Sequence, residues 1–187
     1  CPLIVQGQDG VALADLANGE VSPVMPVIGL NTRGDFPNQA ALVTEDTIFA
    51  VSQRVSVKAI DRQTGQTRWT YNAPSRQIQA IRLDGEQRLV VVGQNAVVGI
   101  GTKDGGVLWT QDFGKTGVNN VQLIQMAGHR ALFTVSGQFK QMWRQYSVLV
   151  DTSNGEILFE FARASDPNCR VMVADRYGYL VMRNDTG

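Results

Sequence analysis

The sequence is poor in the residues from which most metal and catalytic sites are built. Its 187 residues include two cysteines, Cys1 and Cys169, and one histidine, His129. Two cysteines are too few for a disulfide framework, and any histidine-based zinc site or Ser-His-Asp triad would have to rely on His129 alone. The motifs G-x-S-x-G and H-E-x-x-H are absent. We therefore predict a non-enzymatic protein with no catalytic, cofactor-binding or metal-binding residues and no cofactor.

The charges favour neither sign, because 17 basic residues balance 17 acidic ones and no run of like charge occurs. Phosphate binding needs clustered Lys and Arg, so a nucleic-acid partner is not expected. No stretch approaches the ~18 consecutive apolar residues of a membrane-spanning helix. Without a spanning helix or a basic cluster, the sequence suggests membrane attachment only through a lipid anchor, for which Cys1 is the candidate.

A short β-hairpin motif recurs along the chain. Residues Val57–Tyr71 read VKAIDRQTGQTRWTY, which predicts a strand, an Asp, a Thr-Gly turn and a second strand that carries a Trp. Weaker copies place their turn glycines at intervals of 46, 40, 50 and 32 residues. The five glycines are Gly19, Gly65, Gly105, Gly155 and Gly187. A period of roughly 40 to 50 residues is typical of β-propeller blades.

Turn signals every 8 to 12 residues, without a helical period, predict an all-β fold of four-stranded antiparallel blades. Residues 1–187 then form one partial propeller of about four and a half blades, part of a seven- or eight-bladed ring. The bulky residue four positions after the turn glycine, which is Trp69, Trp109 or Phe159, is expected to dock between neighbouring blades. The recurring aspartates Asp15, Asp61 and Asp151 are expected to cap the turns.

The pattern AIDRQTGQTRW at Ala59–Trp69, with its weaker copies, resembles the repeat of pyrroloquinoline-quinone-type propellers. That superfamily includes the quinoprotein alcohol dehydrogenases and the outer-membrane assembly lipoprotein propellers, to which the style of the repeat is closest. The resemblance implies the fold and not the activity, because one repeat serves enzymes and scaffolds alike. A quinoprotein enzyme would need a Ca²⁺ site of oxygen ligands, and often adjacent cysteines, which this sequence lacks.

One hairpin departs from the repeat. The step from Val135 to Asp151 is six residues longer than the equivalent step from Val51 to Asp61. The inserted region, Ser136–Ser147, reads SGQFKQMWRQYS. Aromatic residues, Met and Arg are enriched in the cores of protein interfaces. Its candidate partner-binding residues are Phe139, Lys140, Met142, Trp143, Arg144 and Tyr146; the alternative is that the aromatic residues fold back onto the propeller.

The first residue is Cys1, and an N-terminal Cys is what bacterial lipoprotein processing leaves, with a lipid attached to it. Cys1 is therefore a candidate for lipid attachment; the alternative is a boundary within a longer protein. A lipidated Cys1 would anchor the chain to a membrane without spanning it. We therefore expect a non-catalytic, protein-binding scaffold of the bacterial cell envelope. It would be periplasmic, anchored to the outer membrane, and part of a larger assembly with other envelope proteins. Two alternatives stay open: a fragment of a quinone-dependent dehydrogenase and the ligand-sensing ectodomain of a receptor.

Overall fold

The computed structural model describes residues 2–6, 11–15, 21, 41–74, 77–114, 117–139, 142–162, 169–173 and 180–184. These residues contain sixteen strands, and every pair of neighbouring strands is antiparallel. None of the described residues belongs to a helix that is long and apolar enough to cross a membrane. The predicted all-β fold is confirmed.

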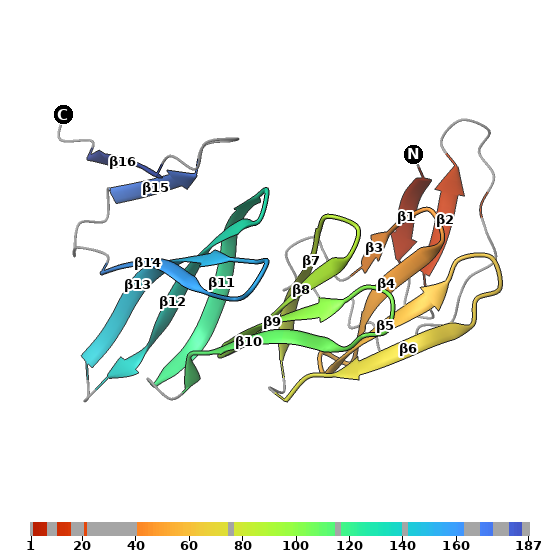
Figure 1. Ribbon diagram of the computed structural model, residues 1–187, viewed down its shortest axis with the longest axis horizontal. Coiled ribbons are helices and arrows are strands. Elements are labelled where there is room, and N and C mark those ends of the chain that lie inside the picture. Colours follow the sequence, from red (N-terminus) through yellow and green to blue (C-terminus); the bar gives the residue numbers. More distant parts are fainter. Residues whose placement is uncertain are drawn as a thin grey trace.

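Three complete sheets of four strands follow one another along the chain, and within each the strands pair in sequence order (Figure 1). The first contains β3 (Ala41–Val43), β4 (Thr47–Ser52), β5 (Ser56–Asp61) and β6 (Thr67–Asn72). The second contains β7 (Ile78–Asp84), β8 (Arg88–Gly93), β9 (Ala96–Gly101) and β10 (Val107–Asp112). The third contains β11 (Val118–Ala127), β12 (Arg130–Phe139), β13 (Met142–Asp151) and β14 (Ile157–Ala162). Each sheet corresponds to one predicted blade.

Two-stranded hairpins lie before and after these sheets. The first pairs β1 (Pro2–Gln6) with β2 (Val11–Asp15), and the last pairs β15 (Cys169–Val173) with β16 (Leu180–Asn184). They match the incomplete first and fifth blades expected from the sequence. The turn glycines Gly19 and Gly187, and Cys1, lie outside the described residues.

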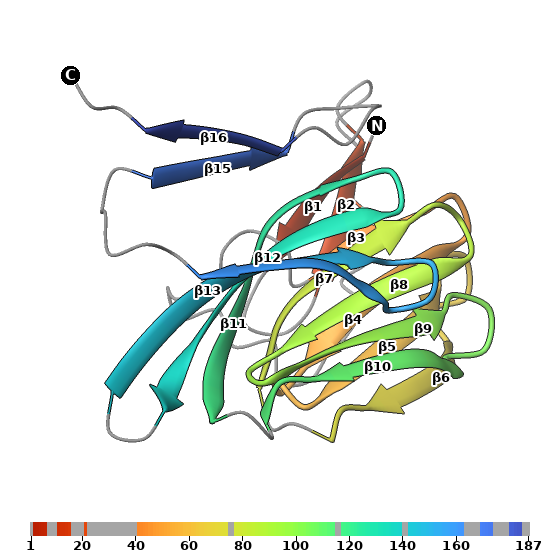
Figure 2. The same ribbon diagram turned by 60° about the vertical axis from the view of Figure 1, so that its left-hand side comes forward.

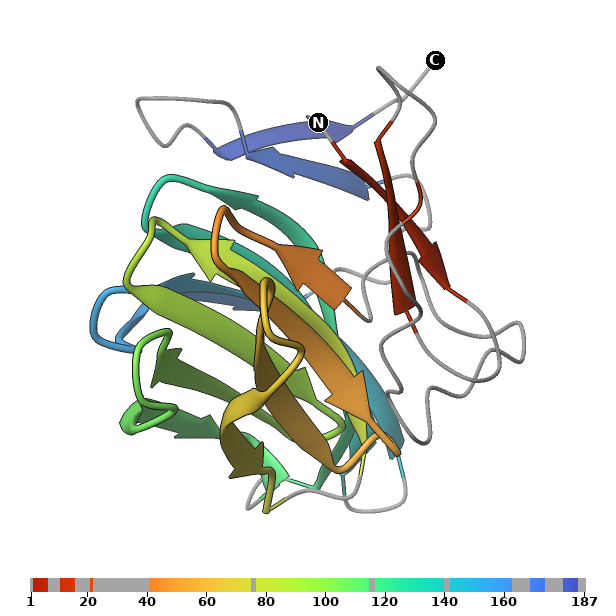
Figure 3. The same cartoon turned by 90° about the vertical axis from the view of Figure 1, so that its right-hand side faces the viewer.

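The three sheets stack face to face in chain order, as Figure 3 shows with the first sheet in front. Strand β8 shows how the middle sheet serves two cores. Leu89 and Val91 pack into the core shared with the first sheet, whereas Val90 and Val92 pack into the core shared with the third. All four are at most 2% exposed. A strand buried on both faces reads as a continuous apolar run, which explains the sequence LVVV.

The repeated turn has the same geometry in all three complete blades. Its glycines Gly65, Gly105 and Gly155 have φ of 70°, 71° and 81°, which residues with a Cβ adopt only at a cost. The Asp61 carboxylate accepts a hydrogen bond from the Thr64 amide at 2.8 Å, and Asp151 accepts one from the Ser153 amide at 2.8 Å. Both aspartates therefore cap their turns. The side chain of Asp15 is not among those described.

The first and second complete blades are each attached to the next blade by the Trp that follows the repeated turn. Trp69 Nε1 donates a hydrogen bond to the Thr102 carbonyl of the second blade at 2.9 Å, and a Cβ on Gly105 would lie 2.7 Å from Trp69 Cε3. Glycine at that turn therefore leaves room for the indole ring of the preceding blade. Phe159, the third residue of this series, is 52% exposed. The turn expected to receive it ends at Gly187, outside the described residues.

A β-bulge precedes each of these aromatic residues, and the sequence did not indicate it. The register shifts at Arg68, Leu108 and Leu158. Each of them is an extra residue without a partner on the facing strand. Such a bulge bends the outer strand and changes the direction of the side chain that follows.

Candidate functional site

The sequence insertion appears in the structure as a lengthened hairpin of strands rather than as a loop. Strands β12 and β13 have ten residues each, against six in β8 and β9, and they pair up to Phe139 opposite Met142. Strand β14 pairs with β13 only as far as Tyr146, so the hairpin runs past its end (Figure 2). Among the described strands, residues 142–145 of β13 therefore pair with β12 alone, as an edge strand does.

The candidate residues of this hairpin divide between its two faces, because alternate residues of a strand point to opposite sides. Trp143 is 64% exposed, the most exposed large apolar side chain of the described residues. Tyr146 lies on the opposite face, partly buried against the core shared with the second blade. Phe139, Met142 and Arg144 are placed by their backbone alone, and Lys140 lies outside the described residues. The hairpin thus presents one exposed aromatic residue and packs another, partly buried, against the core.

The only histidine belongs to a cluster that joins two blades. His129 Nδ1 lies 2.7 Å from Asp84 Oδ1, and Asp84 Oδ2 accepts hydrogen bonds from Thr152 Oγ1 at 2.8 Å and Arg88 Nε at 3.0 Å. The Asp84 side chain is 1% exposed. Burial opposes its ionisation, but hydrogen bonds from His129, Thr152 and Arg88 outweigh burial and lower the pKa of Asp84. With the Thr152 hydroxyl already donating to Asp84, the cluster serves as an inter-blade contact.

The other well-placed carboxylates are also occupied by neighbouring groups. Arg68 contacts Asp61 and Asp46, each at 2.7 Å, within the first complete blade. The hydrogen bond from Arg68 holds the pKa of Asp61 well below its usual range. In the described part of the chain, no three His, Cys, Asp or Glu side chains gather as metal ligands would. The described residues therefore do not fit the calcium-and-quinone site of a quinoprotein dehydrogenase, which needs several converging oxygen ligands.

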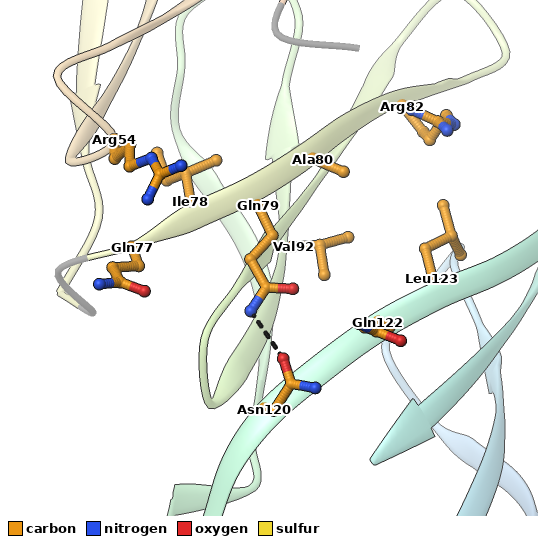
Figure 4. Close-up of a pocket in the computed structure, with 10 residues that line it drawn as sticks. All are labelled: Arg54, Gln77, Ile78, Gln79, Ala80, Arg82, Val92, Asn120, Gln122 and Leu123. Atoms are coloured by element: carbon orange, nitrogen blue, oxygen red, sulfur yellow. Dashed lines mark hydrogen bonds between the residues drawn. The ribbon is translucent and has the colours of Figure 1, made fainter. Parts of the chain in front are cut away.

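A pocket of about 530 Å³ lies between β7 and β11, the first strands of the second and third complete blades (Figure 4). Its apolar wall is formed by Ile78, Ala80, Val92 and Leu123, and its polar groups are Arg54, Gln77, Gln79, Arg82, Asn120 and Gln122. Gln79 Nε2 donates a hydrogen bond to Asn120 Oδ1 at 3.1 Å, which links the two strands across the pocket. The volume is within the range typical of ligand sites.

Two arginines line the pocket, and none of the lining residues that the structure describes is an Asp or Glu. Arg82 Nη1 donates a hydrogen bond to the Ile81 carbonyl at 3.0 Å, and Arg82 has no ion-pair partner within the described residues. Burial lowers the pKa of Arg82, as expected for a cation that has lost water without gaining an anion. Such a group is suited to bind a carboxylate.

Sequence reasoning missed both the pocket and Asp84. The pocket residues come from four segments whose patterns predict only strand and turn, and Gln79 and Asn120 are 41 positions apart. Asp84 directly precedes Gly85, and an Asp-Gly pair predicts a turn without any sign that the carboxylate has a buried partner. The one local signal was the unusual number of Gln and Asn at the start of β7 and β11.

Comparisons with known proteins support the propeller fold. A family model described as outer membrane protein assembly factor BamB matches residues 53–182. The crystal structure of BamB from Moraxella catarrhalis superposes with a TM-score of 0.54 and 13% identity, over 86% of this chain and 60% of the other. A europium-containing methanol dehydrogenase superposes with a TM-score of 0.53 and 13% identity, over 66% of this chain and 24% of the other. Both likenesses concern the fold.

The chain thus spans three fifths of the length of the BamB structure. A comparison with curated protein sequences found no match.

Proposed function

The chain belongs to the family of the outer membrane protein assembly factor BamB, and from this membership we propose that it is a non-catalytic, protein-binding scaffold of the bacterial cell envelope. It works in the periplasm, at the outer membrane, within a larger assembly that handles outer-membrane proteins. Its partners are other envelope proteins. A lipid on Cys1 holds it at the membrane, and the mass of the N-terminal peptide from native membranes tests that attachment.

The lengthened hairpin of β12 and β13 supports this proposal most directly. It extends beyond its own blade and carries Trp143, which is 64% exposed. Trp is enriched among the residues that dominate protein-binding energy, and its side chain has few rotatable bonds to immobilise on binding. The hairpin therefore supplies a contact for a protein partner, with Trp143 at its centre.

Photo-cross-linking in cells of the source bacterium tests this contact. Trp143 is replaced by p-benzoylphenylalanine, which keeps an aromatic group, and Leu108 on β10 is replaced in the same way as the control. Leu108 is a fair match because it is apolar and 55% exposed. We expect position 143, and not position 108, to form an adduct with a component of the outer-membrane assembly machinery. No adduct, or the same adducts from both positions, would contradict the proposed contact.

A separate assay distinguishes the scaffold from the dehydrogenase. The full-length protein is incubated with pyrroloquinoline quinone and Ca²⁺, and the oxidation of short alcohols is followed with an artificial electron acceptor. A scaffold gives no turnover above the rate without protein. Turnover that requires both additions would favour the dehydrogenase and overturn the non-catalytic assignment.

A further inference from the structure

The repeated turn of the third complete blade contains an asparagine followed directly by glycine. Asn154 and Gly155 lie between β13 and β14, where Asn154 is exposed and Gly155 is buried. In such a pair the glycine amide nitrogen can attack the side-chain carbonyl carbon of the asparagine, because glycine has no side chain to hinder the approach. The new bond closes a five-membered succinimide ring and expels ammonia. Water then opens the ring to aspartate or to isoaspartate, in which the main chain runs through the side-chain carbonyl.

Hydrogen bonds hold both reacting groups of this pair. The Gly155 amide donates to the Asp151 carbonyl at 2.8 Å, so its nitrogen keeps the proton that it must lose when it attacks. Asn154 Oδ1 accepts a hydrogen bond from the Glu156 amide at 2.9 Å, which fixes the orientation of the side chain. The intact turn therefore opposes formation of the succinimide.

The preceding blade supplies a third restraint. The indole of Trp109 lies so close to Gly155 that a Cβ there would be 2.7 Å from Cε3, and Trp109 Nε1 donates a hydrogen bond to the Thr152 carbonyl at 2.8 Å. Ring closure must rotate the main chain between Asn154 and Gly155, and the indole restricts that rotation. The pair should therefore react only after the indole has moved away. That step is a local opening of the joint between two blades, which costs less than unfolding of the whole protein.

The second complete blade shows which product the turn tolerates. Asp104 stands at the position of Asn154, and its Oδ1 accepts a hydrogen bond from the Gly106 amide at 2.9 Å, as Asn154 Oδ1 does from Glu156. Aspartate can therefore cap this turn as well as asparagine does. Isoaspartate adds one methylene group to the main chain between Asp151 and Glu156, whose hydrogen bond of 2.8 Å closes the turn. A turn lengthened in this way no longer presents the same surface to the indole.

We propose that Asn154 is a modification site whose conversion to isoaspartate is controlled by Trp109. The pair reacts when the indole leaves Gly155, and the isoaspartate that forms prevents the second and third complete blades from restoring this joint. The reaction consumes one water molecule, releases one ammonia molecule and needs no oxidant or reductant. The modification thus makes opening of the joint irreversible, and it is independent of the partner contact at Trp143.

Peptide mapping of the full protein, stored at mildly alkaline pH, tests the proposal. Cleavage after Arg144 and Arg163 releases residues 145–163, in which Asn154 is the only asparagine. Mass spectrometry measures the deamidated fraction, and an isoaspartate-specific methyltransferase distinguishes isoaspartate from aspartate. The reference is the free peptide DTSNGEI, residues 151–157, which has the same pair without the joint. We expect the folded protein to react roughly tenfold or more slowly than this peptide, and equal rates would overturn the proposal.

Two matched variants test the role of the indole. Trp109→Phe removes the hydrogen bond to Thr152 and should accelerate deamidation of Asn154 roughly fivefold or more. Trp69→Phe makes the same change in the joint between the first and second complete blades and should leave the rate at Asn154 unchanged. Circular dichroism shows that both variants are folded. Equal rates at Asn154 in the two variants would contradict control by Trp109.

The effect on the joint is measured with the modified protein. Protein in which Asn154 has become isoaspartate should unfold at a lower urea concentration than fresh protein, whereas Asn154→Asp should unfold at the unchanged concentration. Asn154→Ser, stored in the same way, corrects for reaction at other sites such as Asn18, which also precedes a glycine. If the isoaspartate form and Asn154→Asp unfold at the same urea concentration, the modification does not hold the joint open and the proposal fails.

Discussion

The indole ring of Trp109 lies directly over Gly155, the turn glycine of the next blade. A Cβ on Gly155 would lie 2.7 Å from Trp109 Cε3, and Trp109 Nε1 donates a hydrogen bond to the Thr152 carbonyl in the same turn at 2.8 Å. Trp69 and Gly105 repeat this contact one blade earlier. The recurring Gly and Trp of the sequence are therefore two halves of one inter-blade joint, each supplied by a different blade.

Gly155→Ala should destabilise the protein by about 2–4 kcal/mol. The added methyl group would collide with the indole ring of Trp109, and alanine adopts the positive φ of this turn only at a cost. Gly85→Ala is the matched control. Gly85 also has a positive φ, 64°, but nothing lies within 4 Å of its Cβ position. Its substitution should cost only about 1 kcal/mol. Urea denaturation measures both, and equal losses would contradict the close contact at Gly155.

Trp109→Phe tests the hydrogen bond of the same joint. Phe retains most of the apolar contact but leaves the Thr152 carbonyl without its donor, in a site where Trp109 is 8% exposed. We expect a loss of about 1–3 kcal/mol in the free energy of unfolding. Trp69→Phe should cost less, because Trp69 is only partly buried and water can reach its acceptor. A larger loss from Trp69→Phe than from Trp109→Phe would contradict this dependence on burial.

The pH dependence of stability should depend on Asp84. Its folded-state pKa lies below the value of about 3.9 for an unfolded chain, so the carboxylate stabilises the fold fully above that value. The stabilisation is lost as the pH falls through the folded-state pKa. Asp84→Asn should therefore cost about 1–3 kcal/mol at neutral pH and reduce the acid-induced fall in stability. Thermal unfolding between pH 7 and pH 2 measures this change.

The stability of the Asp84→Asn variant should still fall with acid, because other carboxylates also have lowered pKa values. Hydrogen bonds from Arg68 lower the pKa of Asp46 and Asp61, and hydrogen bonds from Ser153 lower that of Asp151. Thr152→Val removes one of the donors to Asp84. The stability of this variant should therefore depend on pH less steeply than that of the unchanged protein and more steeply than that of Asp84→Asn. If the profile of Asp84→Asn were as steep as that of the unchanged protein, the buried cluster would not be the source of the pH dependence.

The sequence was informative where the chain repeats itself and uninformative where different blades meet. Turn glycines, capping aspartates and the positions of Trp69 and Trp109 follow from short-range patterns, because each hairpin is built from consecutive residues. Thr152 and Asp84 are 68 positions apart, and no periodicity connects them. Residue counts along the repeats reveal the insertion but not its conformation, because the sequence of Ser136–Ser147 is equally compatible with a loop and with two longer strands.

The division of the β12–β13 hairpin into two faces can be tested by comparing two aromatic residues three positions apart. Trp143 is 64% exposed, whereas Tyr146 packs against the core between the second and third blades. Trp143→Ala should therefore change the free energy of unfolding by less than about 0.5 kcal/mol, as exposed substitutions usually do. Tyr146→Ala should cost about 2–4 kcal/mol, because it leaves a cavity beside Val135 on the facing strand. Urea denaturation measures both variants, and Phe at position 146 is the control, since it keeps the ring and should recover most of the loss. A large loss of stability from Trp143→Ala would mean that this residue stabilises the fold, and the proposed partner contact would then lose its main support.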